Sequence, residues 1–164
     1  MLPQQEIENL THARTDEIVP PGWTLVALEA RFASADQALK AEDKVMHIAR
    51  MVAQASLDTT WPTNEEWKAR LPEWFLPSFH YYSKEELEQY LKHNDREAIG
   101  WHFGSWLDSM HNRSWRWWSM QRDETRVRVN VIVDGWPYSV GALAHLLKAA
   151  GADSVFDQSE KVNI

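Results

Sequence analysis

Residues 115–133 read WRWWSMQRDETRVRVNVIV, and this stretch decides the fold. A valine occupies every second position from Val127 to Val133, and polar side chains fill most of the positions between them. Such an alternation of period two is typical of a strand with one buried face. An aromatic segment, Trp115 to Gln121, precedes it across four polar residues. The two segments together predict a β-hairpin near residues 114–134.

The loop of this hairpin sets which tryptophans face the core. Residues 122–125 contain no Gly or Asn for a primed two-residue turn, so we expect a four-residue loop on a type I turn. That register places Trp118 and Met120 on the valine face, and it places Trp117 on the opposite face with the arginines. A three-residue loop would exchange the faces and bury Trp115 and Trp117 instead.

The flanking sequence predicts one further strand and several helices. Residues 23–32 are apolar on both faces, which is typical of an interior strand. Helices are expected after four capping residues: Ser34, Thr63, Ser83 and Ser139. Thr63 and Ser83 each have a glutamate three positions later, which is the pattern of a capping box. Since strands and helices do not alternate, we expect an α+β fold. In this fold we expect a small, mainly antiparallel sheet that packs with four to five helices.

Length and composition limit the remaining possibilities. The chain has 164 residues, which predicts a single α+β domain over 20–164 after a polar N-terminal tail or short helix at 1–19. There is no cysteine, and no apolar run approaches the roughly 18 residues of a membrane span. Residues 1–20 have no apolar segment of a secretory signal. We therefore expect a cytoplasmic protein without a membrane partner.

The charge is acidic and unevenly distributed. Lys and Arg number 17 and Asp and Glu number 24, giving −7, and residues 101–164 contribute zero with seven of each sign. An acidic surface repels nucleic acids and favours a basic protein partner. In composition the chain resembles small, acidic, cysteine-free α+β proteins that neutralise a toxin, as bacterial immunity proteins do. The resemblance implies a toxin as one possible partner and carries no residue roles.

The first hypothesis is therefore a non-enzymatic protein-binding domain, and an immunity or inhibitor protein is its sharpest form. Ten tryptophans are more than one small core is expected to bury completely, so exposed indole edges are predicted. Acidic residues would steer the partner and aromatic residues would anchor it. The predicted partner-binding residues are Glu65, Glu66, Trp67, Trp74, Tyr82, Glu85, Glu86 and Glu88.

A small enzyme is the alternative hypothesis, because four histidines lie within 32 residues. They are separated by 13, 9 and 9 positions, and no pair has the spacing of three or four that adjacent ligands on a helix need. We therefore expect no metal and no cofactor. The candidates for acid–base work in a pocket lined by His and Trp are His80, His102, Asp108 and His111.

A second alternative is single-stranded RNA binding through the hairpin. Residues 113–128 carry five arginines against two acidic residues, a local charge of +3, with tryptophans between them. Arginine beside an aromatic ring can stack an unpaired base. The face in question is Trp117, Arg126 and Arg128. The overall charge of −7 argues against this hypothesis.

Overall fold

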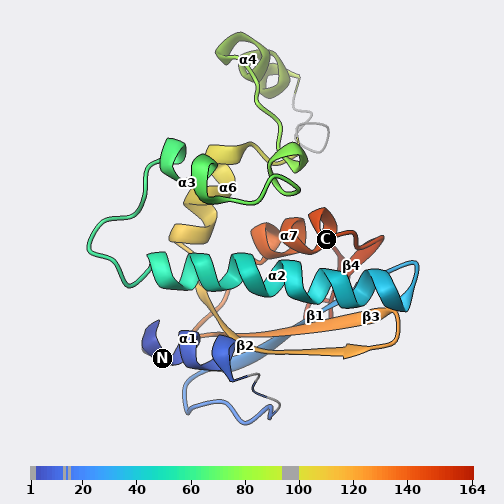
Figure 1. The fold of residues 1–164 in the computed structure, drawn as a ribbon. Helices are drawn as coiled ribbons and strands as arrows, with labels where there is room; N and C mark the ends of the chain where they lie inside the picture. The colour runs from blue at the N-terminus through green and yellow to red at the C-terminus, as the bar shows by residue number, and fades with distance from the viewer. Residues whose placement is uncertain (1–2, 13, 15, 94–99) are drawn as a thin grey trace.

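The computed structural model describes residues 3–12, 14, 16–93 and 100–164, which form an α+β fold (Figure 1). The elements follow in the order α1 (Pro3–Thr11), β1 (Thr24–Arg31), α2 (Ala35–Ala55), α3 (Asn64–Arg70), the 3-10 turn η1 (Leu76–Ser78), α4 (Lys84–Lys92), α6 (Phe103–His111), β2 (Trp115–Asp123), β3 (Arg126–Val133), α7 (Gly141–Ala149), β4 (Ser154–Asp157) and β5 (Val162–Asn163). The N-terminal segment thus contains a short helix.

The sheet has five strands in the order β2-β3-β1-β4-β5, and every neighbouring pair is antiparallel. Strand β1 lies at its centre, as the two-sided apolar pattern of residues 23–32 predicts. Strands β2 and β3 form the predicted hairpin. The fold class expected from the sequence is therefore confirmed.

The helix starts follow the capping residues with one exception. Ser34 accepts a hydrogen bond from the Gln37 amide at the start of α2, and both predicted capping boxes are present before α3 and α4. The prediction for Ser139 is wrong, because α7 begins after Val140 without a side-chain cap. None of the helices in the described part of the chain is long and apolar enough to cross a membrane.

The core lies between the valine face of the sheet and the helices above it. Helices α2 and α7 lie across this face, and α3 and α6 form a further layer beyond them (Figure 1). The long helix α2 buries a stripe at helical spacing, Val45, Ile48 and Val52. The facing strands contribute fully buried aliphatic residues, among them Val129 and Val131. Burial of this aliphatic surface supplies the main driving force for folding.

The hairpin loop differs from the expected one. Asp123 pairs directly with Arg126, so the loop has two residues, and Glu124 adopts the positive φ, 51°, that such a turn usually assigns to Gly or Asn. A two-residue loop keeps the same faces as a four-residue loop near the turn. Met120 therefore lies opposite Val129 on the valine face, as predicted.

A β-bulge between Trp117 and Ser119 then exchanges the faces of the rest of β2. Trp117 pairs with Val131 and joins the core, and Trp115 pairs with Val133. The predicted placement of Trp117 and Trp118 is thus wrong, because the irregularity shifts the register by one residue. The bulge therefore buries Trp115 and Trp117, the two tryptophans that a three-residue loop would also have buried.

Helix α1 is joined to the body by a buried ion pair. The Glu6 carboxylate lies 2.7 Å from the Arg113 guanidinium, and both side chains are only 2% exposed. The other oxygen of the Glu6 carboxylate accepts the Trp117 amide N–H at 2.8 Å, beside the β-bulge. Arg113 also donates to the Ser56 hydroxyl and the Met110 carbonyl. One ion pair therefore joins α1, the ends of α2 and α6, and β2.

We expect Glu6→Ala to lower the free energy of unfolding by about 3–5 kcal/mol, because it leaves a buried guanidinium without its counter-charge. Urea unfolding measures the loss. Glu8→Ala is the matched control, since Glu8 is exposed on the same helix and its removal should change stability by less than about 0.5 kcal/mol. Equal losses in the two variants would contradict the role of the ion pair.

Candidate functional site

A short helical arm, residues 81–92, stands away from the rest of the protein. Its helix α4 lies beyond α3 and α6, at the end of the molecule opposite the sheet (Figure 1). The base of the arm is held by the His80 amide, which donates to the Trp101 carbonyl at 3.0 Å, and by a parallel β-bridge between His80 and His102. Backbone pairing at this base therefore fixes where the arm leaves the body.

Gly100 and the His80 ring are in close contact at the base of the arm. Gly100 has a φ of +60°, and a Cβ atom there would lie 2.5 Å from the His80 ring. Only glycine combines this conformation with so close an approach. The His80 ring stacks in turn on Tyr82, with ring centroids 5.4 Å apart. The two segments that connect the arm to the body are thus packed against each other.

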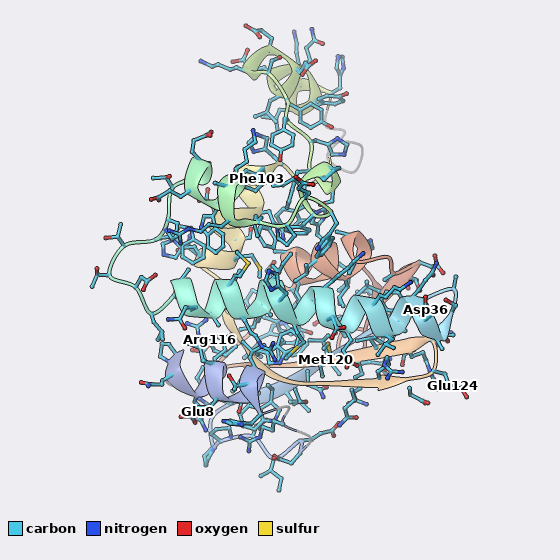
Figure 2. The ribbon with its side chains drawn as sticks, in the orientation of Figure 1. Glu8, Asp36, Phe103, Arg116, Met120 and Glu124 are labelled. Carbon is cyan, nitrogen blue, oxygen red and sulfur yellow. The ribbon has the colours of Figure 1, made fainter. Side chains whose placement is uncertain are left out.

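Helix α4 does not bury its apolar face. Leu87, Tyr90 and Leu91 follow the spacing i, i+3, i+4, which places them on one side of the helix. None of the nine residues of α4 is buried, and Leu91 is 53% exposed. Tyr81, which precedes the helix, is 51% exposed. Figure 2 shows the side chains around α4 standing clear of the body.

The predicted acidic residues of the arm lie on the surface. Glu85 and Glu88 are exposed, whereas Glu86 accepts the Ser83 backbone N–H at 3.0 Å and completes the capping box. Hydrogen bonding of this kind fixes the first turn of the helix. Tyr82 is half-buried against Tyr90, with ring centroids 4.9 Å apart. The arm thus presents carboxylates and aromatic rings together.

The other predicted binding residues are on or near α3, and two of them do not fit the prediction. Glu65 and Glu66 are exposed, but Glu66 is held by the Thr63 backbone in its capping box. Trp67 is only 1% exposed and belongs to the core, so it cannot anchor a partner. Trp74 is half-buried with the Lys44 ammonium 4.9 Å from its ring. The binding surface predicted on α3 is therefore reduced to its carboxylates.

The expectation that some indole edges remain exposed is confirmed, because five of the ten tryptophans are not buried: Trp136 is exposed, and Trp23, Trp61, Trp74 and Trp101 are half-buried. All ten tryptophans lie in the described residues, and Trp136 alone, at 66%, is exposed. The rings pack against one another and against helices. Trp106, for example, is fully buried and donates its indole N–H to the Ala142 carbonyl at 2.9 Å. Several helix layers above one sheet provide more interior than a single two-layer core would.

The histidine set proposed for an enzyme is only partly brought together. His80 and His102 lie side by side at the base of the arm. His111 instead stacks on Trp61, with ring centroids 4.4 Å apart, and Asp108 lines a separate cavity with Arg113. Among residues 3–12, 14, 16–93 and 100–164, no group of three His, Cys, Asp or Glu could hold a metal ion. The four candidates therefore do not converge on one pocket.

A contact between Ser78 and His145, which the sequence does not predict, lies near the base of the arm. The Ser78 hydroxyl is 3.0 Å from Nε2 of His145, and it is also 2.6 Å from the Phe75 carbonyl oxygen. A hydroxyl has one proton, and the carbonyl can only accept it, so His145 donates to Ser78. This arrangement holds the imidazole and does not activate the serine as a nucleophile. With 67 residues between the partners, no local motif signals the contact.

The proposed RNA-binding face of the hairpin is not assembled. Trp117 points into the core, away from the side of the sheet that carries Arg126 and Arg128. Arg126 is paired with an aspartate at 3.3 Å and Arg128 with a glutamate at 3.2 Å. Trp118 replaces Trp117 on this side, but it is buried beneath the guanidinium of Arg14, 3.8 Å from its ring. The bulge therefore removes the exposed ring that base stacking requires.

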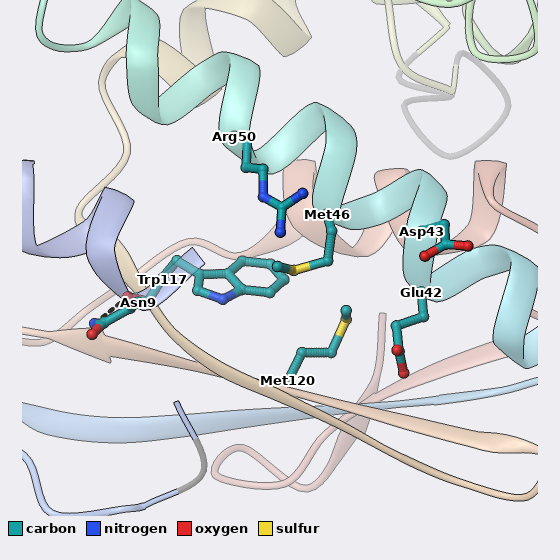
Figure 3. Close-up of a pocket in the computed structure, with 7 residues that line it drawn as sticks. All are labelled: Asn9, Glu42, Asp43, Met46, Arg50, Trp117 and Met120. Carbon is teal, nitrogen blue, oxygen red and sulfur yellow. Dashed lines mark hydrogen bonds between the residues drawn. The ribbon is translucent and has the colours of Figure 1, made fainter. Parts of the chain in front are cut away.

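A cleft of about 210 Å³ lies between α2 and β2 (Figure 3). Glu42, Met46 and Arg50 follow one another along α2, and Trp117 and Met120 face them from β2. Two of its three charged residues, Arg50 and Glu42, are paired within the chain. Arg50 donates to the Leu10 carbonyl at 2.9 Å, and Glu42 pairs with Arg122 at 3.4 Å. These contacts join α1, α2 and β2, so we assign the cleft a structural role.

Comparison of the chain with known protein families, with curated proteins and with solved structures gives no match.

We expect Gly100→Ala to loosen the arm, because the methyl group meets the His80 ring in a backbone conformation that favours glycine. The measurement is amide hydrogen exchange across 80–93, which should accelerate, together with a loss of about 2 kcal/mol or more on urea unfolding.

Gly22→Ala is the matched control, since Gly22 has a φ of +85° but open space around a Cβ atom. It should cost about 1 kcal/mol and leave α4 unchanged. If the two glycine variants behave alike, the His80 contact does not hold the arm.

Burial, with smaller contributions from Lys148 and His80, lowers the pKa of His145 from its ordinary 6.5 to about 4. The unfolded chain therefore binds a proton at a higher pH than the folded protein, and stability should fall as the pH drops from about 6.5 towards 4. We expect His145→Gln to reduce this loss by about 1–2 kcal/mol in urea titrations. His12→Gln, at an exposed position, is the control. Parallel pH curves for wild type and His145→Gln would contradict the assignment.

Proposed function

We propose that the protein is a binding module that holds a basic protein partner through helix α4. The observation that carries the proposal is an amphipathic helix, with a capping box at its start and β-pairing at the base of its arm, whose apolar residues are not buried: Leu91 is 53% exposed, and Leu87 and Tyr90 are half-buried. A helix that contributes nothing to the core has little reason to keep Leu87, Tyr90 and Leu91 on one side unless another surface covers them.

The spacing of these residues suits one mode of recognition. Helices that dock into a groove of a partner use anchors at i, i+3 and i+4, which is the spacing of Leu87, Tyr90 and Leu91. On the helical wheel Glu86 and Glu88 lie on either side of this apolar stripe. The nine residues span about 13 Å, enough for two or three anchors. The partner would thus offer an apolar groove with basic residues at its rim.

Charge supports a basic partner through steering more than through local pairing. The arm carries three glutamates against two lysines, whereas the whole chain carries −7. A net charge of this size raises the association rate with a cationic protein, and salt weakens the effect. The contact energy itself would come from burial of the tyrosines and leucines, because exposed ion pairs contribute only about 0–1 kcal/mol each.

The sharpest form of the proposal is an inhibitor or immunity protein that neutralises a basic toxin. The acidic excess and the absence of cysteine support it, as does the protrusion of helix α4 from the described part of the chain. In this form, expression of the chain together with its partner should suppress the partner's toxicity, and the arm variants below should lose that protection.

The test is affinity capture from extracts of the source cells with wild-type protein and two arm variants. We expect a basic protein bound by the wild type to be lost with Leu87→Ser/Leu91→Ser, which removes the apolar anchors. With Glu85→Lys/Glu88→Lys we expect a loss of about tenfold at low salt that shrinks at high salt, because steering is screened.

Asp58→Lys/Glu160→Lys is the control, since it makes the same charge change at exposed positions outside the arm. It should weaken binding less than the arm variant does, because its charges lie outside the docking helix and salt screens them over that distance. Circular dichroism confirms that every variant is folded. An identical set of captured proteins for the wild type and both arm variants would overturn the proposal.

A further inference from the structure

Trp136 lies in solvent on the turn between β3 and α7. It is 66% exposed, whereas the other nine tryptophans are buried or half-buried. A ring with this exposure has at least one open face. A single exposed apolar side chain is common on protein surfaces and needs no explanation by itself. The surroundings of Trp136 therefore decide whether it marks a binding surface.

Contacts that reach strand β4 position the Trp136 ring. Tyr138 meets it edge to face, with ring centroids 4.7 Å apart and an angle of 86° between the ring planes. The Tyr138 hydroxyl donates to the buried Asp157 carboxylate at 2.9 Å. The other oxygen of that carboxylate accepts the amide N–H groups of Ser159 and Glu160. The aromatic corner formed by Trp136 and Tyr138 is thus held in place before any ligand binds, which lowers the entropic cost of binding.

The charge around the aromatic corner is negative. Three acidic residues and one lysine belong to the two segments that form it: Asp134, Asp157, Glu160 and Lys161. Burial raises the pKa of Tyr138 well above its usual range, the hydrogen bond and the charge of Asp157 add to the rise, and the Glu160 carboxylate contributes further. Negative charge therefore acts at the aromatic corner, where it favours a cationic ligand.

Elsewhere in the protein, tryptophan rings are covered by cations of the chain itself. The Arg14 guanidinium lies 3.8 Å from the centroid of the Trp118 ring, and the Lys44 ammonium lies 4.9 Å from that of Trp74. Among the described residues, no lysine or arginine lies over Trp136 in this way. Tryptophan attracts cations more strongly than the other aromatic side chains do. The open face of Trp136 is therefore available to a cation of another molecule.

The exposure of the ring indicates which cation fits best. A compact ammonium such as trimethylammonium is bound where several aromatic rings surround it, and in the described structure Tyr138 is the one aromatic neighbour of Trp136. A guanidinium is planar, so it can stack on a single open ring and donate to a carboxylate at the same time. The aromatic corner is therefore suited to arginine.

We propose that the aromatic corner binds an arginine side chain of a basic protein, with the guanidinium stacked on the Trp136 ring and its N–H groups towards the carboxylates of Asp134 and Glu160. The net charge of −7 would steer such a protein towards the chain. The proposal uses no residue of the arm, so it and the docking of α4 can each hold without the other.

The test is an NMR titration of the full chain with a flexible peptide of arginine, glycine and serine. Two matched peptides replace each arginine by lysine or by citrulline, which has the planar shape of arginine without its charge. We expect a saturable shift of the Trp136 indole signal with the arginine peptide and none with the citrulline peptide. The lysine peptide should bind about twofold to fivefold more weakly, because an ammonium cannot stack on the ring.

Trp136→Ala should weaken binding of the arginine peptide by about twofold to fivefold, the size of one exposed contact between a cation and a ring. The backbone amide signals of 134–139 report this binding, and Trp136→Phe, which keeps a smaller ring, should bind with intermediate strength. Tyr81→Ala is the matched control and should bind as the wild type does, because Tyr81 is also exposed but has the Lys68 ammonium 5.2 Å from its ring centroid.

Four results would overturn the inference. The arginine peptide could give no saturable shift, the citrulline peptide could bind equally well, or the lysine peptide could bind as tightly as the arginine peptide. The fourth is that Trp136→Ala binds the arginine peptide as tightly as Tyr81→Ala does.

Discussion

The contact between Glu6 and Arg113 is the constraint on which the rest of the structure depends. Strand β2 is at the edge of the sheet, and beside its β-bulge the Glu6 carboxylate accepts the Trp117 amide N–H. Asn9, one turn further along α1, donates to the Trp117 carbonyl at 3.3 Å. Helix α1 thereby covers the edge strand of the sheet at its most irregular point. A buried ion pair is stable only when its remaining polar atoms are also satisfied, and here they are.

The bulge and the helix that covers it determine which side chains remain available to bind a partner. With the bulge in place, Trp115 and Trp117 enter the core, and Trp118 is covered by the segment that follows α1. The indole rings are thus used mainly for packing, and the hairpin has no exposed ring with which to bind a base. Helix α4 differs from the other described α-helices, because none of its residues is buried. Helix α4 on the arm is therefore the described α-helix whose apolar residues are least used for packing in the core.

Local patterns in the sequence predict most of the elements, whereas contacts between distant residues decide the exceptions. Strand β1, helix α2 and both capping boxes depend on neighbouring residues, so periodicity and capping chemistry suffice to find them. The bulge is different, because it is supported by Glu6, 111 residues away from the amide that it accepts. For the candidate site, the acidic residues of α4 could be predicted from its capping box. The burial of Trp67 could not, because composition does not reveal how many layers cover a ring.

The central claim is that the apolar side of α4 is covered by a basic partner. Because the chain has no cysteine, a photo-crosslinker can be attached at a single introduced thiol. The most direct measurement compares Glu88→Cys, beside the apolar stripe, with Asp58→Cys outside the arm, in extracts of the source cells. We expect a crosslink to one basic protein from position 88 and none to that protein from position 58. Identical adducts from both positions, or none from position 88, would contradict it.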